Sequence, residues 1–204
     1  MAGQLREHRR LETQRLIQEQ AVRLFVERGY EATTVADVAE AAGVSAMTVY
    51  RHFPTKEDLV LVDQHAPDIA ERIAASPAEL PLVRRIGGAL IDGAAAETKG
   101  GRGKELTPRG QFLLARLKLM ISTPALRARH LDNSYVLQRA IVGALGYDAN
   151  DPDKLFQAEA AAGACLAALH TAVVRWAEDD GRSDLPGLLR MALAAAFGDT
   201  SADA

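Results

Sequence analysis

Apolar residues recur at helical spacing along nearly the whole chain, and this pattern constrains the fold more than any other feature. In the stretch from residue 9 to residue 28, the recurring set is Leu16, Ile17, Ala21, Leu24 and Phe25. Alternation of apolar and polar residues, which would indicate a strand, occurs nowhere in the sequence, and aromatic residues make up only 5% of it. The sequence therefore predicts an all-α protein.

The predicted helices change character near residue 60. Before it they are short and separated by turns of three or four residues. A fourth helix is expected from residue 55 to about residue 75, capped by Thr55 with Asp58 three residues later. After residue 60 the helices are long and alanine-rich, near 79–97, 109–122, 124–146, 153–179 and 184–197, with a glycine-rich break at 99–104. We expect a three-helix head, residues 1–54, and a larger helical body, residues 55–204.

Capping residues define the short helices of the head. Thr34 precedes an apolar segment and is followed three residues later by Asp37, which resembles a capping box, and Gly43 ends that helix. Ser45 is a good N-cap for the next helix, which should stop before Pro54 because the residue ahead of a proline is pushed out of the α region. Two short helices joined by a tight glycine-containing turn are the sequence form of a helix-turn-helix.

The second helix of this motif has a mixed outer face. At 100° per residue, Val49 and Phe53 share one side and should pack inward, while Met47, Thr48 and Arg51 lie opposite. Such a surface suits DNA, since a threonine hydroxyl can bond base edges and a methionine can pack on a thymine methyl group. The DNA-binding residues predicted from this pattern are Thr34, Ala46, Met47, Thr48, Tyr50, Arg51, His52 and Lys56. The alternative is an ordinary amphipathic helix.

The charge of the chain restricts how it could bind DNA. A net charge of -3 and an isoelectric point near 6.0 do not suit a protein that coats nucleic acid by charge alone, so any DNA contact must be local. A small basic cluster lies near the N-terminus and consists of Arg6, Arg9, Arg10 and Arg15, interrupted by Glu7 and Glu12. It is either a solvated helix start or a basic arm that touches DNA.

Four short stretches between residues 12 and 60 follow a known pattern. They are Phe25-Val26-Glu27-Arg28-Gly29-Tyr30, Thr33-Thr34-Val35, Ala41-Ala42-Gly43-Val44-Ser45 and Tyr50-Arg51-His52-Phe53-Pro54-Thr55-Lys56-Glu57. Through them the segment resembles the TetR family of bacterial transcriptional regulators. The resemblance implies a homodimer that binds a palindromic DNA operator, usually as a repressor, and releases it when a small molecule enters the C-terminal body.

The same resemblance assigns DNA contacts by motif position. The matching positions are Thr34, Ser45, Ala46, Met47, Thr48, Tyr50, His52 and Lys56. Position 46 departs from the pattern, because many members of the family carry a larger polar or basic residue where this chain has alanine. A strong base-specific hydrogen bond is therefore not expected there.

The body resembles a subgroup of these regulators with an acyl-CoA-like ligand-binding domain, chiefly through Ser122-Thr123-Pro124-Ala125-Leu126-Arg127-Ala128-Arg129. A long apolar effector with an anionic end, such as a fatty acyl thioester, would suit a pocket between apolar helix faces with an arginine near its mouth. The candidate ligand-binding residues are Phe112, Leu113, Arg116, Leu117, Met120, Leu169, Val173 and Trp176, with Ile121 beside them and Arg85 or Arg139 as further cations. The alternative is that these residues simply form the core.

The last two predicted helices favour self-association. Residues 158–172 are rich in alanine, so two copies could approach closely, and the final helix adds Leu185, Leu188, Leu189, Leu193 and Phe197. Four such helices from two chains would form a two-fold bundle, which matches the symmetry of a palindromic site. We therefore expect a homodimer through these helices.

Catalysis and metal binding are not indicated by the sequence. The five histidines are scattered without metal-ligand spacing, and Cys165 lies on an apolar helix without an evident base. We expect no enzyme activity, no cofactor and no metal. The single cysteine and the absence of an apolar leader favour the cytoplasm, and no apolar run reaches the roughly 20 residues that cross a membrane.

Two other functions fit the same sequence. One is a ligand-independent or architectural DNA-binding protein, which would have the same head and a solidly packed body. The other is a helical protein that binds a small molecule and whose head no longer binds DNA.

Overall fold

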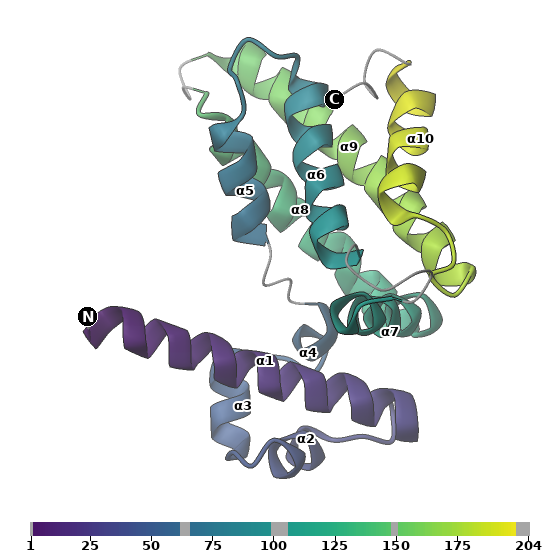
Figure 1. Cartoon of the computed structure of the whole chain (residues 1–204). Coiled ribbons are helices and arrows are strands. Elements are labelled where there is room, and N and C mark those ends of the chain that lie inside the picture. Colours follow the sequence, from purple (N-terminus) through teal and green to yellow (C-terminus); the bar gives the residue numbers. More distant parts are fainter. Residues whose placement is uncertain (1, 62–65, 99–105, 148–150, 199–204) are drawn as a thin grey trace. The chain divides into compact units, whose positions relative to one another are not determined.

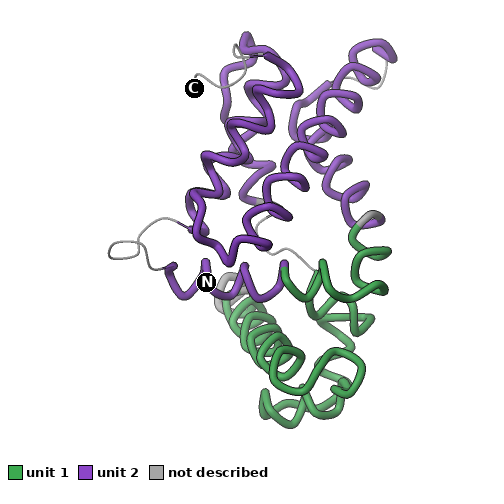
Figure 2. The backbone as a smooth tube through the Cα atoms, turned by 90° about the vertical axis from the view of Figure 1, so that its right-hand side faces the viewer, with its two compact units in different colours: residues 1–62, 118–130 green, residues 63–117, 131–204 purple. Residues whose placement is uncertain are grey.

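The chain is described by a computed structural model that covers residues 2–61, 66–98, 106–147 and 151–198 (Figure 1). Every regular element in these ranges is a helix, which confirms the predicted all-α class. The chain forms two compact units (Figure 2). The head unit comprises residues 1–62 and 118–130, and the body unit comprises residues 63–117 and 131–204. The functional boundary expected between residues 54 and 55 stays a prediction.

Four helices of the head unit come from the start of the chain. They are α1 (Ala2–Arg28), α2 (Val35–Ala41), α3 (Ala46–His52) and α4 (Asp58–Leu61). The end of α7 (Pro108–Ser122) and the start of α8 (Pro124–Leu145) also belong to this unit. The two short helices begin directly after their predicted caps, whereas α1 begins earlier than the apolar pattern indicated.

The core of the head unit is built on one face of α1. Ile17, Ala21, Leu24 and Phe25 are almost completely buried there, as the periodicity predicted, whereas Leu16 of the same predicted set is 41% exposed. Side chains from the following helices and their ends close this core, namely Val38, Val49, Phe53 and Leu59. The apolar area that these residues remove from water holds α2 and α3 against α1.

The turn between α2 and α3 depends on Gly43. Its φ of +65° lies in the left-handed region, which glycine enters without the steric cost of a Cβ atom. The amide of Ala42 donates to the carbonyl of Val38 at 2.9 Å, and the amide of Val44 donates to that of Ala39 at 3.0 Å. These bonds end α2 and direct the chain into α3, which gives the predicted helix-turn-helix.

The body unit contains most of α7 and α8 together with α5 (Ala66–Ala75), α6 (Leu82–Thr98), α9 (Pro152–Glu178) and α10 (Leu185–Phe197). The five long segments predicted after residue 60 are all present, each with ends within three residues of those expected. The predicted fourth helix corresponds to α4 and α5, and residues 62–65 of it lie outside the described residues. The predicted break at 99–104 also lies outside them.

The core of the body unit lies between α6, α9 and α10, which run side by side (Figure 1). Ile86 and Trp176 are fully buried there. Leu185, Leu189 and Leu193, which were expected at the dimer interface, are instead buried in this core of the single chain. A Cβ atom on Gly87 of α6 would lie 3.0 Å from Cδ1 of Leu193 on α10, so these two helices approach closely. Burial raises the pKa of the Cys165 thiol to about 12, and the thiol is therefore protonated at neutral pH.

Helix α9 is the one helix in the described part of the chain that is long and apolar enough to cross a membrane. A core helix of a globular protein passes the same test, and α9 buries Ala158, Ala162 and Trp176 in the body core. Its length and composition are therefore weak evidence for a membrane span.

Candidate DNA-binding surface

Ser45 sets the start of α3. Its hydroxyl accepts the amide N–H of Thr48 at 3.1 Å, which satisfies one of the backbone donors left open at the start of a helix. The Oγ atoms of Ser45 and Thr48 lie 2.9 Å apart and share a hydrogen bond. The cap therefore also orients the Thr48 hydroxyl, which the sequence predicts to read bases.

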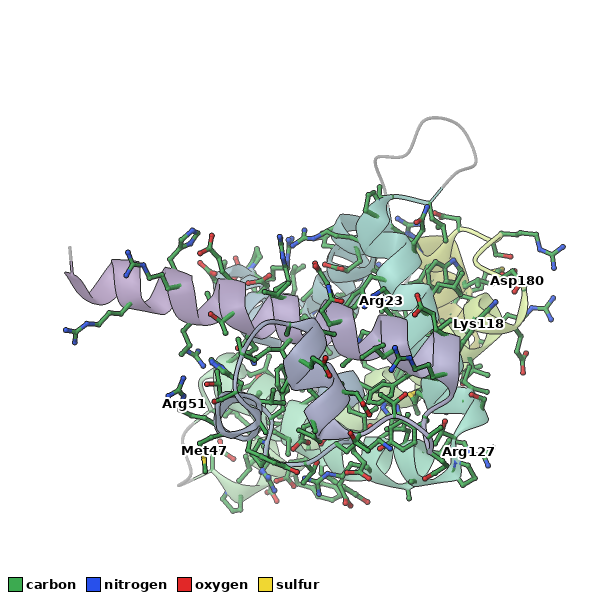
Figure 3. All side chains as sticks on the ribbon, turned by 90° about the horizontal axis from the view of Figure 1, so that it is seen from below. Arg23, Met47, Arg51, Lys118, Arg127 and Asp180 are labelled. Atoms are coloured by element: carbon green, nitrogen blue, oxygen red, sulfur yellow. The ribbon has the colours of Figure 1, made fainter. Side chains whose placement is uncertain are left out.

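The inner side of α3 is anchored in the head core. Val49 and Phe53 are exposed to 0% and 1%, as the helical wheel predicted. On the other side, Met47 is 76% exposed and Tyr50 is 49% exposed. Figure 3 shows Met47 and Arg51 extending outward on the same side of the head unit. A single exposed apolar side chain is common on protein surfaces, so Met47 is notable for its place on the outer side of an anchored helix and not for its exposure alone.

His52 ends α3 and is half-buried. Burial is the main reason that its pKa lies below the ordinary value, and the positive charges of Arg51 and Arg10 lower it further. At neutral pH the imidazole is therefore neutral, with one N–H that can donate a hydrogen bond.

Thr34 forms the capping box of α2 that its spacing predicted. Its amide and its hydroxyl both bond Oδ2 of Asp37, at 2.7 Å and 2.6 Å, and the Asp37 amide donates back to the Thr34 hydroxyl at 3.2 Å. The hydrogen bonds from Thr34 hold the pKa of Asp37 below its usual range. The Thr34 hydroxyl is thus oriented by α2, at an exposed position of the head.

Lys56 is tied to the loop that follows α1. Its Nζ atom donates to the carbonyl oxygen of Tyr30 at 2.5 Å and lies 4.2 Å from the centre of the Tyr30 ring. An ammonium group has three donors, and this bond uses one of them. The side chain that the motif assigns to DNA therefore also fixes the Tyr30 loop.

Comparison with known proteins identifies the family. Residues 17–62 match the family model described as bacterial regulatory proteins, tetR family, and residues 108–197 match the one described as MftR C-terminal domain. The chain is 32% identical over 160 residues to the HTH-type transcriptional regulator TcmR of Streptomyces glaucescens, over 72% of this chain and 66% of TcmR. The chain belongs to the TetR family. Its curated relatives are transcriptional regulators, so the prediction that it is no enzyme is confirmed.

Solved structures agree with this TetR-family fold. The fatty acid degradation regulator FadR from Bacillus halodurans has a TM-score of 0.56 and 20% identity, over 91% of this chain and 95% of that chain. FadR from Bacillus subtilis in complex with stearoyl-CoA has a TM-score of 0.55 and 18% identity, over 90% of this chain and 97% of that chain. At these identities the likeness shows the fold alone. The chain matches only 20% of the length of the transcriptional repressor KstR2 of Rhodococcus jostii and 30% of the length of the regulator YvkB of Bacillus subtilis.

The candidate effector-binding residues of this TetR-family chain differ in burial. Trp176 is completely buried and its indole N–H donates to the carbonyl of Ser183 at 3.0 Å, as expected of a core residue. The half-buried candidates of the body unit are Phe112, Leu113, Arg116, Leu117, Leu169 and Val173. Met120 and Ile121 belong to the head unit, where Met120 is buried.

The arginines considered near a pocket have different surroundings. Arg85 is buried and donates to Oγ of Ser76 at 2.9 Å and to the carbonyl of Ile73 at 3.2 Å, which ties α6 to the end of α5. The guanidinium of Arg116 lies 5.8 Å from the centre of the Phe112 ring. Arg139 is exposed. Arg116 is therefore the arginine associated with an apolar candidate side chain.

Two contacts of the head unit were not predicted from the sequence. They are the bond from Lys56 to Tyr30 and an ion pair between Arg129 and Asp58. The capping spacing from Thr55 to Asp58 was visible in the sequence. It gave no information on Arg129, which is 71 residues farther along the chain. Only the fold brings these groups together.

Proposed function

We propose that this TetR-family chain is a repressor that binds a palindromic DNA operator as a homodimer. In this proposal α3 enters the major groove and places Ala46, Met47 and Thr48 against base edges. The proposed contacts to phosphates and the groove wall are Thr34, Ser45, Tyr50, Arg51, His52 and Lys56. One observation carries the proposal: the outer side of α3 is exposed, Met47 included, while Val49 and Phe53 fix the helix from below.

The domain assignment follows from this proposal. Residues 1–54 form the DNA-binding domain, and residues 55–204 form the effector-binding and dimerisation domain. A regulator that binds chromosomal DNA works in the bacterial cytoplasm.

The proposed dimer uses α9 and α10. Small residues such as Ala160 and Ala167 are exposed on α9, and Met191 on the neighbouring α10 is 62% exposed. Small side chains let two helices approach closely, so two copies of this pair could pack as a four-helix bundle. A two-fold axis would present two α3 helices to half-sites about one helical turn, or roughly 34 Å, apart.

The proposed effector is a largely apolar molecule with an anionic end, such as a fatty acyl thioester. The FadR neighbour from Bacillus subtilis was solved with stearoyl-CoA, and that neighbour supports the class of ligand. In this chain the proposed contacts are the half-buried apolar side chains on α7 and α9, with Arg116 for the anionic end. Effector binding would favour an arrangement of the dimer in which the two α3 helices no longer fit adjacent half-sites.

The test starts with selection of DNA from a random duplex library by the purified chain. We expect an enriched palindrome, a complex of two chains per site by light scattering, and release of the DNA by long-chain acyl-CoA but not by free CoA. Thr48→Ala should change the preferred sequence. A chain that enriches no DNA, or that is monomeric at micromolar concentration, would refute the proposal.

A further inference from the structure

The first three turns of α1 extend past the core of the head unit. Ile17 is fully buried and Gln14 nearly so, but residues 8–12 and Arg6 are exposed. Figure 1 shows this part of α1 running beyond α3. A helical end of this length gains little stability from packing, so its exposed side chains are available to bind a partner.

The charges on this extension are divided between its two sides. At 100° per residue, Arg6 and Arg10 fall within an arc of about 40° that also contains Ile17, so they lie on the side of α1 that faces α3 and the rest of the head core. On the opposite side two glutamates, Glu12 and Glu19, lie beside basic residues of the same helix. His8 lies 3.2 Å from Glu12 and Arg15 lies 3.3 Å from Glu19.

The charge of Arg10 acts on the end of α3. It is one of the causes that lower the pKa of His52, which closes that helix. In Figure 3 the N-terminal part of α1 extends on the same side on which Met47 and Arg51 reach outward. The arginine side of α1 and the outer side of α3 therefore belong to the same unit, and the charge of Arg10 acts on the last residue of α3.

We propose that Arg6 and Arg10 bind phosphate groups of the DNA strand beside the groove that α3 enters. The guanidinium group suits this role because it is always charged and its planar donors match phosphate oxygens. A polyanion is the favoured partner because the same unit carries the proposed DNA-binding helix, and because Glu12 and Glu19 lie on the far side of α1, beside His8 and Arg15. The contact rests on the proposed DNA-binding function and would lengthen each half-site.

The test measures the salt dependence of binding to a duplex selected by the wild-type chain. Each phosphate contact contributes about 0.9 to the slope of the logarithm of affinity against the logarithm of salt concentration. We expect Arg6→Gln and Arg10→Gln each to reduce the slope by about 0.9, and the double variant by about 1.8. Glutamine and arginine have similar helix propensities, so α1 should stay helical, which circular dichroism checks.

Arg15→Gln is the matched control, because it removes the same charge from the opposite side of the same helix. We expect Arg15→Gln to leave the salt slope unchanged. Arg10→Lys keeps the positive charge, so its slope should equal that of the wild-type chain. Trimming base pairs from the duplex ends should weaken the wild-type chain more than the double variant. If Arg10→Gln and Arg15→Gln reduced the salt slope equally, the inference about Arg6 and Arg10 would be wrong while the proposed function could still hold. A wild-type chain that selects no DNA would overturn the proposed function as well.

Discussion

The Nη2 atom of Arg129, on α8, lies 3.9 Å from Oδ1 of Asp58, the first residue of α4. The other oxygen of this carboxylate accepts the amide of Thr55 at 3.0 Å, and the Asp58 amide donates to the Thr55 hydroxyl at 3.3 Å. One buried carboxylate therefore caps α4 and pairs with α8. Because α8 continues from the head unit into the body unit, we predict that this ion pair affects the proposed release of DNA by an effector.

Removing the arginine tests that influence. Arg129 is 43% exposed and the pair is long, so Arg129→Ala should cost less than about 1 kcal/mol of stability. If the proposed function holds, DNA affinity without effector should change little, while more acyl-CoA should be needed to release the DNA. A titration of the DNA complex with acyl-CoA measures this shift.

Arg127→Ala is the control, since it removes an exposed arginine from the same helix. Its release curve should match that of the wild-type chain. Identical curves for Arg129→Ala and the wild type would show that the ion pair does not couple the effector to the head.

Substitutions at Ser45 and Met47 should have different effects, the first on stability and the second on the DNA sequence that the chain prefers. Ser45→Ala removes the cap of α3 and should lower the free energy of unfolding by about 1 kcal/mol. Met47→Ala removes a side chain that is 76% exposed and should leave stability nearly unchanged while altering the preferred DNA sequence. Chemical denaturation and library selection measure the two effects. A Met47→Ala chain that selects the same DNA would contradict base contact by this residue.

The fold could be predicted where its causes are local. The capping boxes at Thr34 and Thr55 and the Ser45 cap are three-residue patterns, and the structure contains each of them. The start of α1 was predicted too late, at residue 9, because residues 2–8 contain no apolar stripe. A helical end that does not contribute to a core leaves no periodic signal.

The candidate site could be predicted only in part for a related reason. The helical wheel correctly placed Val49 inside and Met47 outside, because the geometry of the single helix α3 determines both positions. Periodicity cannot distinguish a core residue such as Trp176 from a residue that lines a pocket, since both lie on an apolar helix face. The contacts of Lys56 with Tyr30 and of Arg129 with Asp58 arise from tertiary packing, which no local pattern records.

Lys56 should contribute to stability as well as to DNA binding. Lys56→Met keeps the apolar stem but removes the bond to the Tyr30 carbonyl and the cation over the Tyr30 ring, at a cost of roughly 1–2 kcal/mol. The melting temperature of the chain and its affinity for a selected duplex should therefore both fall. If Lys56→Met lost DNA affinity with an unchanged melting temperature, the lysine would act on DNA alone.

His52 should titrate below its ordinary pKa of 6.5. Burial is the main cause, so the unfolded chain binds more protons than the folded chain near that pH, and stability should fall as the pH drops through about 6.5. Arg10→Gln removes a neighbouring positive charge and should raise the pKa of His52 in NMR titrations without DNA. Arg15→Gln should leave it unchanged. A His52 pKa that is insensitive to Arg10→Gln would place the two groups too far apart to interact.

Gly181 and Gly88 should respond in opposite ways to the same substitution. Gly181 has a φ of +72°, and a Cβ atom there would lie 2.8 Å from Cδ1 of Leu106 and 3.3 Å from the ring of Trp176. Gly181→Ala should therefore destabilise the body by more than about 1 kcal/mol. Gly88 lies inside α6 with nothing within 4 Å of a Cβ, so Gly88→Ala should stabilise the chain by roughly 0.5–1 kcal/mol. Trp176 is the only tryptophan in the chain, so its fluorescence can follow both unfolding curves. A Gly181→Ala chain as stable as Gly88→Ala would mean that the turn before α10 adapts to a side chain.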